Sequence, residues 1–315
     1  MTKFVVGAYP ASSAHHRWNP DEESRFYSLL SNDLRIRALE LPWMGKLHPH
    51  DKQWLIENYP DNLNAIITTI PFVMKQMSND PFYGLASTKS EGRKAAISDI
   101  RYVLDEVNNL HERTGRSIVK LIEIHSAPRQ FGEPTFLAES LIEINSWDWG
   151  DVDIAIEHCD ALIAGQNPEK GFLTLEEEIE AIENSSTNIG IFINWGRSAI
   201  ELRGSEGVEI HIKRAKEANL LRGLIFSGAS NKKGLFGEAW LDAHHPFKKN
   251  ARHTFGDPDS LLSDEVAATA CRVAGEIPWI GMKMGWAPGV SGTVDERYQM
   301  ISEALDSLSK SHPLK

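Results

Sequence analysis

The feature that most constrains the fold is a regular alternation of short apolar runs with segments of helical periodicity along the whole chain. Eight such runs occur, each of strand length and rich in β-branched and aromatic residues. Continuous apolar runs of this length are typical of strands that are buried on both faces, as in a parallel sheet covered by helices. The predicted strands lie at residues 4–9, 36–42, 64–71, 118–125, 152–158, 188–194, 221–227 and 279–284.

Helix start signals stand between these runs. Pro20 opens the first helix, and Thr174 with Glu177 and Thr293 with Glu296 have the spacing of capping boxes. Further helices are predicted at residues 51–57, 90–111, 135–144, 207–218 and 263–275. Eight β/α units in succession predict a (β/α)8 barrel. The alternative, an open doubly wound sheet, often carries a Gly-rich phosphate turn after its first strand, where this chain reads PASSAHH.

No linker of low complexity and no internal repeat interrupts the alternation, so we expect residues 1–315 to form one α/β domain, a single barrel.

The chain has 33 Lys and Arg against 44 Asp and Glu, a net charge of −11, which argues against nucleic acid or an anionic membrane surface as partner. The apolar runs are too short to span a membrane. The start is too short for a signal-peptide core, and we expect a cytoplasmic protein with Cys159 and Cys271 as buried, reduced thiols.

Polar side chains gather where the predicted strands end, which in a barrel of this kind is the catalytic face. Any one of them has an alternative interpretation as a structural residue satisfied by its neighbours. The convergence of six strands nevertheless favours a solvated site, because burying so many charges is costly. These residues are Glu40, Glu123, His125, Glu157, His158, Asp160, Asn194, Arg197, Ser227 and Lys283, joined by Asp242, His244 and His245 from the loop after the seventh strand.

Three tryptophans, Trp43, Trp195 and Trp286, follow strand ends closely. Their rings are suited to stacking on the apolar faces of sugars, and equally to packing under loops. The adjacent pair His244 and His245 is a weak metal signal, because neighbouring side chains usually diverge. The sequence contains no HExxH, GxSxG or Cys-based nucleophile motif, which makes nucleophilic hydrolysis an unfavoured chemistry.

Four segments together resemble those of the xylose-isomerase-like barrels. They are LEL at the second strand, IEIH at the fourth, IAIEHCD at the fifth and DAHHP in the seventh loop. That superfamily includes sugar isomerases and epimerases, related inositol and keto-sugar enzymes, and endonuclease IV. The chain looks closest to an uncharacterised bacterial family within it. The resemblance implies a (β/α)8 barrel with its site at the carboxyl ends of the strands.

In metal-dependent members of that superfamily, a divalent ion is held at the ends of strands five to eight. Its ligands are a Glu at strand five, an Asp and often a His at strand six, a His at strand seven and a Glu at strand eight. The resemblance places Glu157 at the first position, but Asn194, Arg197, Ser227 and Lys283 at the others. A charged Lys has no lone pair to offer a metal. We therefore predict no divalent metal and no cofactor here, with the ammonium of Lys283 in the place of the cation and within salt-bridge distance of Glu157.

The first functional hypothesis is a metal-independent sugar or keto-sugar isomerase, epimerase or lyase that removes a proton next to a carbonyl. Lys283 and Arg197 would stabilise the developing oxyanion, and Glu157, with a raised pKa, or His125 would be the base. A Schiff base on Lys283 is a minor alternative. The substrate, a small carbohydrate, is expected to contact the remaining residues of the strand ends and loops: Glu40, Trp43, His158, Asn194, Trp195, Ser227, Asp242, His244 and Trp286.

The second hypothesis is a barrel that binds a sugar or sugar acid without turnover, in which Glu157 and Lys283 form a structural replacement for a lost metal site. If a non-standard metal site exists at the barrel mouth, its plausible ligands are Glu123, His125, Glu157 and His158. The sequence leaves the choice between the two hypotheses open, and it leaves assembly into a homo-oligomer open as well.

Overall fold

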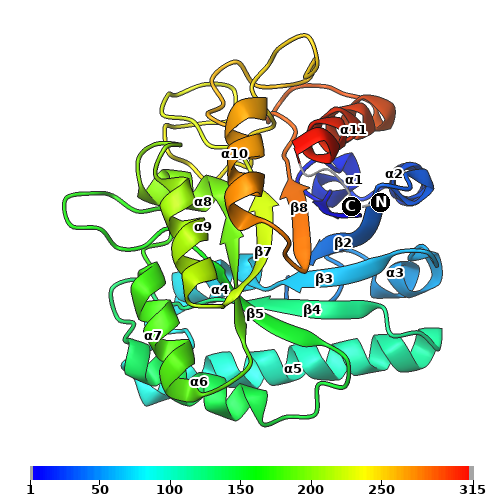
Figure 1. Cartoon of the computed structure of the whole chain (residues 1–315). Coiled ribbons are helices and arrows are strands. Elements are labelled where there is room, and N and C mark those ends of the chain that lie inside the picture. Colours follow the sequence, from blue (N-terminus) through cyan, green and yellow to red (C-terminus); the bar gives the residue numbers. More distant parts are fainter. Residues whose placement is uncertain (1–2, 312–315) are drawn as a thin grey trace.

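The computed structural model describes residues 3–311 and contains a closed barrel of eight parallel strands in sequence order. Helices surround this barrel, as Figure 1 shows. The predicted (β/α)8 architecture is confirmed, and each strand lies within its predicted segment. The strands are β1 (Phe4–Gly7), β2 (Ile36–Pro42), β3 (Asn64–Thr68), β4 (Val119–Ile124), β5 (Asp153–His158), β6 (Gly190–Asn194), β7 (Leu221–Phe226) and β8 (Trp279–Lys283).

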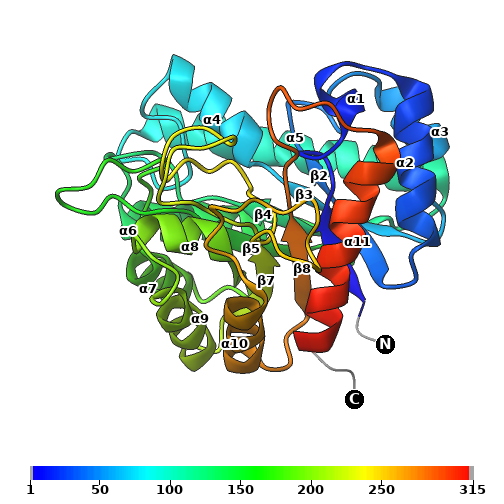
Figure 2. The same cartoon turned by 90° about the horizontal axis from the view of Figure 1, so that it is seen from above.

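The helices lie outside the strands, and the view from above in Figure 2 shows them around the barrel. They are α1 (Ser13–His16), α2 (Pro20–Asn32), α3 (Lys52–Asn58), α4 (Ile70–Asn79), α5 (Ser90–Thr114), α6 (Pro134–Asn145), α7 (Leu175–Ser185), α8 (Trp195–Glu201), α9 (Val208–Glu217), α10 (Asp264–Ala274) and α11 (Val294–Ser311).

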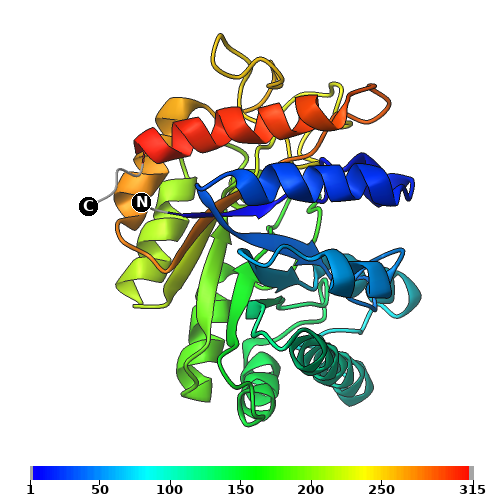
Figure 3. The same ribbon diagram turned by 90° about the vertical axis from the view of Figure 1, so that its right-hand side faces the viewer.

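Closure of the barrel joins the two ends of the sequence. β1 pairs with β8, and this pairing sets Gly7 opposite Lys283. On the outside, α11 packs beside α2, as Figure 3 shows. A residue from the first strand therefore lies next to the polar end of the last one.

Two helices begin directly at strand ends, where the sequence had predicted either more strand or a loop. The strand predicted to reach residue 71 ends at Thr68, because Pro71 occupies the first turn of α4, where a missing N–H is tolerated. α8 begins immediately after β6, and its N-cap Asn194 accepts a hydrogen bond from the backbone N–H of Arg197. The capping box predicted at Thr174 and Glu177 is present at the start of α7.

The barrel interior is layered along its axis. The side chains that fill its lower part form an apolar cluster separate from the main core between barrel and helices, and they are Val5, Ala38, Ile66, Leu121, Ala155, Phe192 and Ile225. Residues two positions further along a strand point to the same side. The next inward layer, toward the carboxyl ends, is consequently set by residues two positions after these.

Within residues 3–311, none of the helices combines the length and the apolarity needed to cross a bilayer. Cys159 and Cys271 are both free and buried, in agreement with the prediction of buried thiols.

Candidate active site at the carboxyl end of the barrel

The second inward layer is polar on seven of the eight strands. It consists of Glu40, Thr68, Glu123, Glu157, Asn194, Ser227 and Lys283. The first six each lie two residues after a side chain of the lower layer, and Lys283 lies two residues after Gly281 of β8. All seven are at most 1% exposed. The expectation that so many polar groups would face a solvated site is therefore wrong for this structure. The groups are closed off from solvent, and ion pairs and hydrogen bonds compensate for the burial of most of them, with Glu123 as the exception.

Glu157 is the centre of this layer. Nη1 of Arg197 lies 2.6 Å from its Oε2, and Nζ of Lys283 lies 3.5 Å from its Oε1, as the sequence predicted for the latter pair. Asn194 Nδ2 donates to Oε1 at 3.0 Å, and Thr68 Oγ1 donates to Oε2 at 3.2 Å. Both carboxylate oxygens are thus engaged from several directions.

The environment of Glu157 decides its protonation. Burial alone would raise the pKa of Glu157, but Arg197 and then Lys283 outweigh burial and hold that pKa well below its ordinary value. The expected raised pKa is therefore wrong. A carboxylate with a depressed pKa and fully occupied oxygens is a poor proton acceptor, so the geometry makes Glu157 a group that positions Arg197 and Lys283.

Lys283 has a second and closer partner. Its Nζ lies 2.5 Å from Oε1 of Glu40, while Oε2 of Glu40 has no hydrogen-bond partner among residues 3–311. Gly7 makes room for this pair, because a Cβ there would lie 2.9 Å from Cγ of Lys283 and 3.3 Å from Oε2 of Glu40.

The charge states of Lys283 and Glu40 follow from these contacts. Burial lowers the pKa of Lys283, but Glu157 and Glu40 raise it well above its usual value, which is the opposite of what an amine nucleophile needs. The contacts of Lys283 therefore do not favour the Schiff-base alternative. For Glu40, burial raises the pKa more than Lys283 lowers it.

Glu123 and His125 share the inward face of β4. Both carboxyl oxygens of Glu123 lack a hydrogen-bond partner within the described chain, and burial together with Glu157 raises its pKa well above normal. His125 lies with Nε2 at 3.1 Å from Oε2 of Glu157 and Nδ1 at 3.1 Å from Oγ1 of Thr69. Burial lowers the pKa of His125 to about 4 in spite of Glu157. The raised pKa of Glu123 favours the protonated carboxyl, and the lowered pKa of His125 favours the neutral imidazole.

The loop between β7 and α10 covers the second inward layer, which we call the charged layer. Asp242 in this loop accepts from Nε of Arg197 at 3.1 Å and from Nζ of Lys170 at 2.9 Å. His244 approaches Oγ of Ser227 with Nδ1 at 3.0 Å, so Asp242, His244 and Ser227 do join the site. Lys170, in the loop after β5, has no sequence signal that separates it from the chain's other lysines.

His158 belongs elsewhere, which corrects its prediction as a substrate contact. Because side chains alternate along β5, Glu157 points into the barrel and His158 points out of it. Outside, Nδ1 of His158 lies 2.8 Å from Oε2 of Glu178, and Nε2 lies 3.1 Å from Oε2 of Glu201. Burial lowers the pKa of His158, but the two carboxylates raise it to about 10.

Two of the three tryptophans are also placed differently from the predicted sugar platforms. Trp43 and Trp195 are each 1% exposed and belong to the core between barrel and helices. Trp286 is half-buried, lies under the guanidinium of Arg297 and packs against Phe255. Of the three, Trp286 alone borders a sizeable cavity, about 280 Å³, away from Glu157.

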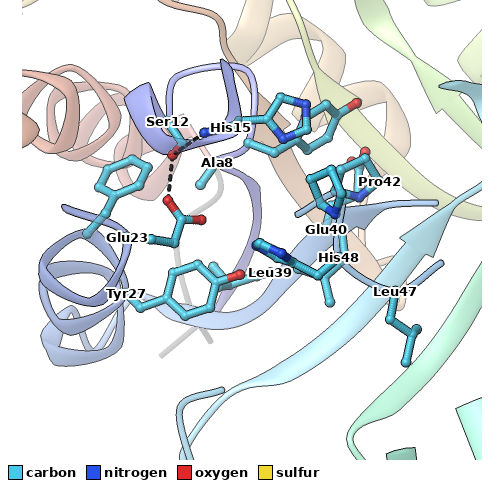
Figure 4. Close-up of a pocket in the computed structure, with 14 residues that line it drawn as sticks. Ala8, Ser12, His15, Glu23, Tyr27, Leu39, Glu40, Pro42, Leu47 and His48 are labelled. Atoms are coloured by element: carbon cyan, nitrogen blue, oxygen red, sulfur yellow. Dashed lines mark hydrogen bonds between the residues drawn. The ribbon is translucent and has the colours of Figure 1, made fainter. Parts of the chain in front are cut away.

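A small cavity borders the charged layer on the side of β1 and β2. It has a volume of about 20 Å³, enough for one water molecule, and Tyr9 and Glu40 are among its lining residues. Figure 4 shows Ser12 in its wall, with Oγ donating to Glu23 and accepting from the backbone N–H of His15. Glu40 thus lines a cavity, whereas Glu157 does not line it.

The donor set at strands five to eight does not fit the divalent metal of the related barrels. Glu157 is the one carboxylate among the four positions, and Asn194 and Ser227 are neutral. The charged nitrogens of Arg197 and Lys283 lie against the two oxygens of Glu157, where a cation would have to bind. The cluster neutralises its own carboxylate.

Comparison with known proteins agrees with this fold. A family model described as "Domain of unknown function (DUF4862)" matches residues 5–300. The uncharacterized protein STM3670 of Salmonella typhimurium (strain LT2) is 33% identical over 318 residues, covering 98% of this chain and 97% of its own length. These matches extend over nearly all of the barrel.

Solved structures with the same fold are xylose-isomerase-like barrels. A putative xylose isomerase from Rhodospirillum rubrum gives a TM-score of 0.62 at 9% identity, covering 98% of this chain and 99% of that one. The IOLI protein with a binding zinc atom gives 0.61 at 12% identity, with both chains fully covered. D-psicose 3-epimerase from Clostridium cellulolyticum H10 gives 0.52 at 12% identity over 99% and 98% of the two chains. At these identities the likeness establishes the fold.

Proposed function

Since the chain belongs to the DUF4862 family and has the fold of the xylose-isomerase-like barrels, we propose that it is a carbohydrate-processing enzyme that works without their divalent metal. The proposed reaction is proton transfer next to the carbonyl of a sugar or keto-sugar, which leads to isomerisation, epimerisation or elimination. The single observation that carries the proposal is the pair of buried cations, Arg197 and Lys283, held against Glu157 at the catalytic end of the barrel.

In this proposal Arg197 and Lys283 stabilise the negative charge that develops on the substrate. Removal of a proton next to a carbonyl builds negative charge on the carbonyl oxygen, and fixed positive charge in a water-poor site stabilises it strongly. Glu157 is the positioning residue, since it holds both cations in place. No rearrangement of charge is then needed when the substrate reacts.

The proton carrier we propose is Glu40, in place of Glu157. One oxygen of Glu40 is held by Lys283 and the other is unpartnered, and Glu40 is among the residues that line the small cavity. Its raised pKa brings the carboxyl closer to the range in which general bases work. His125 and Glu123, on the inward face of β4, are the second pair of groups able to exchange a proton.

Substrate entry requires that the β7–α10 loop open. Asp242 closes this loop onto Arg197 and Lys170, and its carboxylate occupies the guanidinium edge that a substrate oxygen would use. The structure therefore corresponds to a closed state in this proposal. A sugar acid, which carries its own carboxylate, is the ligand class best able to replace Asp242 at that edge.

Solvent hydrogen exchange tests this function without knowledge of the product. The chain is incubated in D₂O with panels of aldoses, ketoses and sugar acids, and deuterium at the carbon next to the carbonyl is measured by NMR. We expect exchange with at least one class, abolished by Glu40→Gln and by Lys283→Met. The control is Glu180→Gln, an exposed carboxyl on α7. Exchange that survives Glu40→Gln would reject Glu40 as the proton carrier.

The second candidate is a barrel that binds a sugar or sugar acid without turnover. The complete enclosure of Glu157 and Lys283 favours it, because a saturated buried network also serves as a structural replacement for a metal. Calorimetry on the same panels separates the two functions. Binding without any deuterium incorporation supports the binding protein, and the absence of both binding and exchange would contradict a carbohydrate function of either kind.

A further inference from the structure

A second cluster of buried ligand-type side chains lies outside the barrel wall, between β5 and the helices α7, α8 and α9. Figure 1 shows where these four elements lie in the fold. We call His158, Glu201, His211 and Glu178 the outer histidine cluster. Two imidazoles and two carboxylates come together there from four separate elements, and all four residues are buried. The proposed function makes no use of them.

The arrangement within the cluster is directional. Nδ1 of His158 is held at 2.8 Å by Glu178, and Nδ1 of His211 is held at 3.0 Å by Oγ of Ser198. Both rings consequently direct Nε2 toward the same carboxylate, Glu201, at 3.1 Å from Oε2 and 3.5 Å from Oε1. Metal-binding histidines in proteins are anchored in this way, with the second ring nitrogen bound to a carboxylate or another oxygen.

We propose that Nε2 of His158, Nε2 of His211 and the carboxylate of Glu201 bind one divalent transition metal of the zinc type. Their ligand atoms all lie within 4.8 Å of one another. Ligand atoms of a tetrahedral zinc site with bonds near 2.0–2.1 Å are separated by about 3.3 Å, so only small side-chain movements are required. Imidazole nitrogen with one carboxylate is a donor set that suits zinc rather than calcium or magnesium.

The cluster is nearest to solvent on the side of His211 and Glu201, and three protein ligands leave one position of a tetrahedral site to a fourth ligand. The side chain of His211 is 10% exposed and that of Glu201 is 6% exposed, whereas His158 and Glu178 are fully enclosed. A metal therefore enters past His211, and a water molecule completes the coordination from that side. The alternative is a doubly protonated His158, which would donate one N–H to Glu178 and the other to Glu201. Measurement of metal uptake distinguishes this state from a bound metal.

A metal there would support the charged layer inside the barrel. His158 follows Glu157 directly on β5, and Glu201 lies one helical turn after Arg197 on α8. Coordination of His158 and Glu201 would fix β5 to α8 from outside, and thereby fix the distance between Glu157 and Arg197 inside. This site is distinct from the metal position of the related barrels, whose residues point inward.

Metal uptake by the full chain, without a histidine tag, tests the proposal. The protein is dialysed against Zn²⁺, and bound metal is measured by elemental analysis. Co²⁺ is then titrated while the visible absorption is recorded, because tetrahedral Co²⁺ absorbs strongly. We expect one zinc per chain, an intense Co²⁺ spectrum and a raised melting temperature. Wild-type protein that takes up no zinc and gives no such spectrum would overturn the proposal.

Variants locate the metal. His211→Ala and Glu201→Gln are expected to lose the zinc, and Ser198→Ala, which removes an anchor, is expected to weaken binding about 10- to 100-fold. The matched control is His253→Gln, since Nε2 of His253 faces a single carboxylate, Asp264, at 2.9 Å without the convergence of a second imidazole. Unchanged zinc content in both folded ligand variants would reject the site. Since the readout is metal content, it remains informative even if the proposed enzymatic function fails.

Discussion

Arg197 is a closer partner of Glu157 than Lys283 is. Nη1 of Arg197 lies 2.6 Å from Oε2 of Glu157, while Nζ of Lys283 lies 3.5 Å from Oε1, and all three side chains are fully buried. The ammonium of Lys283 is closer to Glu40, at 2.5 Å. The charged layer therefore contains three linked ion pairs, in which Glu157 is shared by Arg197 and Lys283, and Lys283 is shared by Glu157 and Glu40. The coupling between residues is expected to follow these distances.

Glu157 is expected to couple more strongly to Arg197 than to Lys283. Breaking a buried ion pair by removing one partner costs about 3–5 kcal/mol, because the other charge is left uncompensated. Arg197→Met should therefore destabilise the fold by this amount, and adding Glu157→Gln should recover part of the loss. Urea unfolding of the two double-mutant cycles provides the measurement. Equal coupling energies for both pairs, or additive effects in the Arg197 cycle, would contradict the assignment.

Glu40→Gln is expected to rescue Lys283→Met better than Glu157→Gln does. When Lys283 is replaced, Glu157 keeps Arg197, Asn194 and Thr68, but Glu40 loses its closest charged partner. The free energy of unfolding, measured for the three single and two double variants, decides the order. A better rescue by Glu157→Gln would show that the longer contact is the stronger one.

The pH dependence of stability is expected to reveal Glu123. Its pKa is raised well above normal, so the folded state binds a proton that the unfolded chain releases near its ordinary pKa of about 4.3. Stability from this group is complete below that pH and declines as the pH rises toward the folded pKa. Glu123→Gln does not titrate. Its stability relative to wild type should therefore increase between pH 4.5 and 7.5, and a pH-independent difference in urea unfolding would refute the raised pKa.

Gly7 is expected to be required for the Lys283–Glu40 pair. A methyl group at this position would press on the aliphatic part of Lys283 beside the β1–β8 pairing. Gly7→Ala should destabilise the protein by about 1–3 kcal/mol through overpacking. Gly204→Ala is the control, because a Cβ at Gly204 meets nothing within 4 Å. If thermal unfolding shows both variants equally stable, the space around Lys283 is less restricted than the structure indicates.

Replacement of Glu157 is expected to leave the divalent metal content of the purified protein unchanged. The positions that hold the ion in related barrels carry a guanidinium and an ammonium here, so Glu157 has no metal to lose. Elemental analysis of wild type and Glu157→Gln gives the comparison. A stoichiometric Mn or Zn that disappears in Glu157→Gln would show that the substitution argument is wrong.

Much of the barrel was predictable from the sequence because its signals are local. The apolar runs located all eight strands, and Thr174 with Glu177 marked the start of α7 through a capping box that spans only four residues. The residues at the strand ends were also found, because alternation assigns Glu123 and His125 to one face of β4 without any tertiary information. α4 was not predicted, since its apolar start, Ile70–Pro71–Phe72–Val73, continues the strand pattern.

The sequence by itself determined most of the side chains that reach the carboxyl end of the barrel, although Thr68 and Lys170 were found only in the structure. The tertiary structure decided what each of them does there. The pKa of Glu157 is set by Arg197 and Lys283, which are 40 and 126 residues away in the chain. Asp242 meets Arg197 and Lys170 only because the fold brings the loop after β7 against α8 and the loop after β5. Hydrophobic periodicity is repeated every few residues and can be recognised in the sequence, whereas an electrostatic contact depends on one distance between remote groups, and that distance exists only once the barrel has closed.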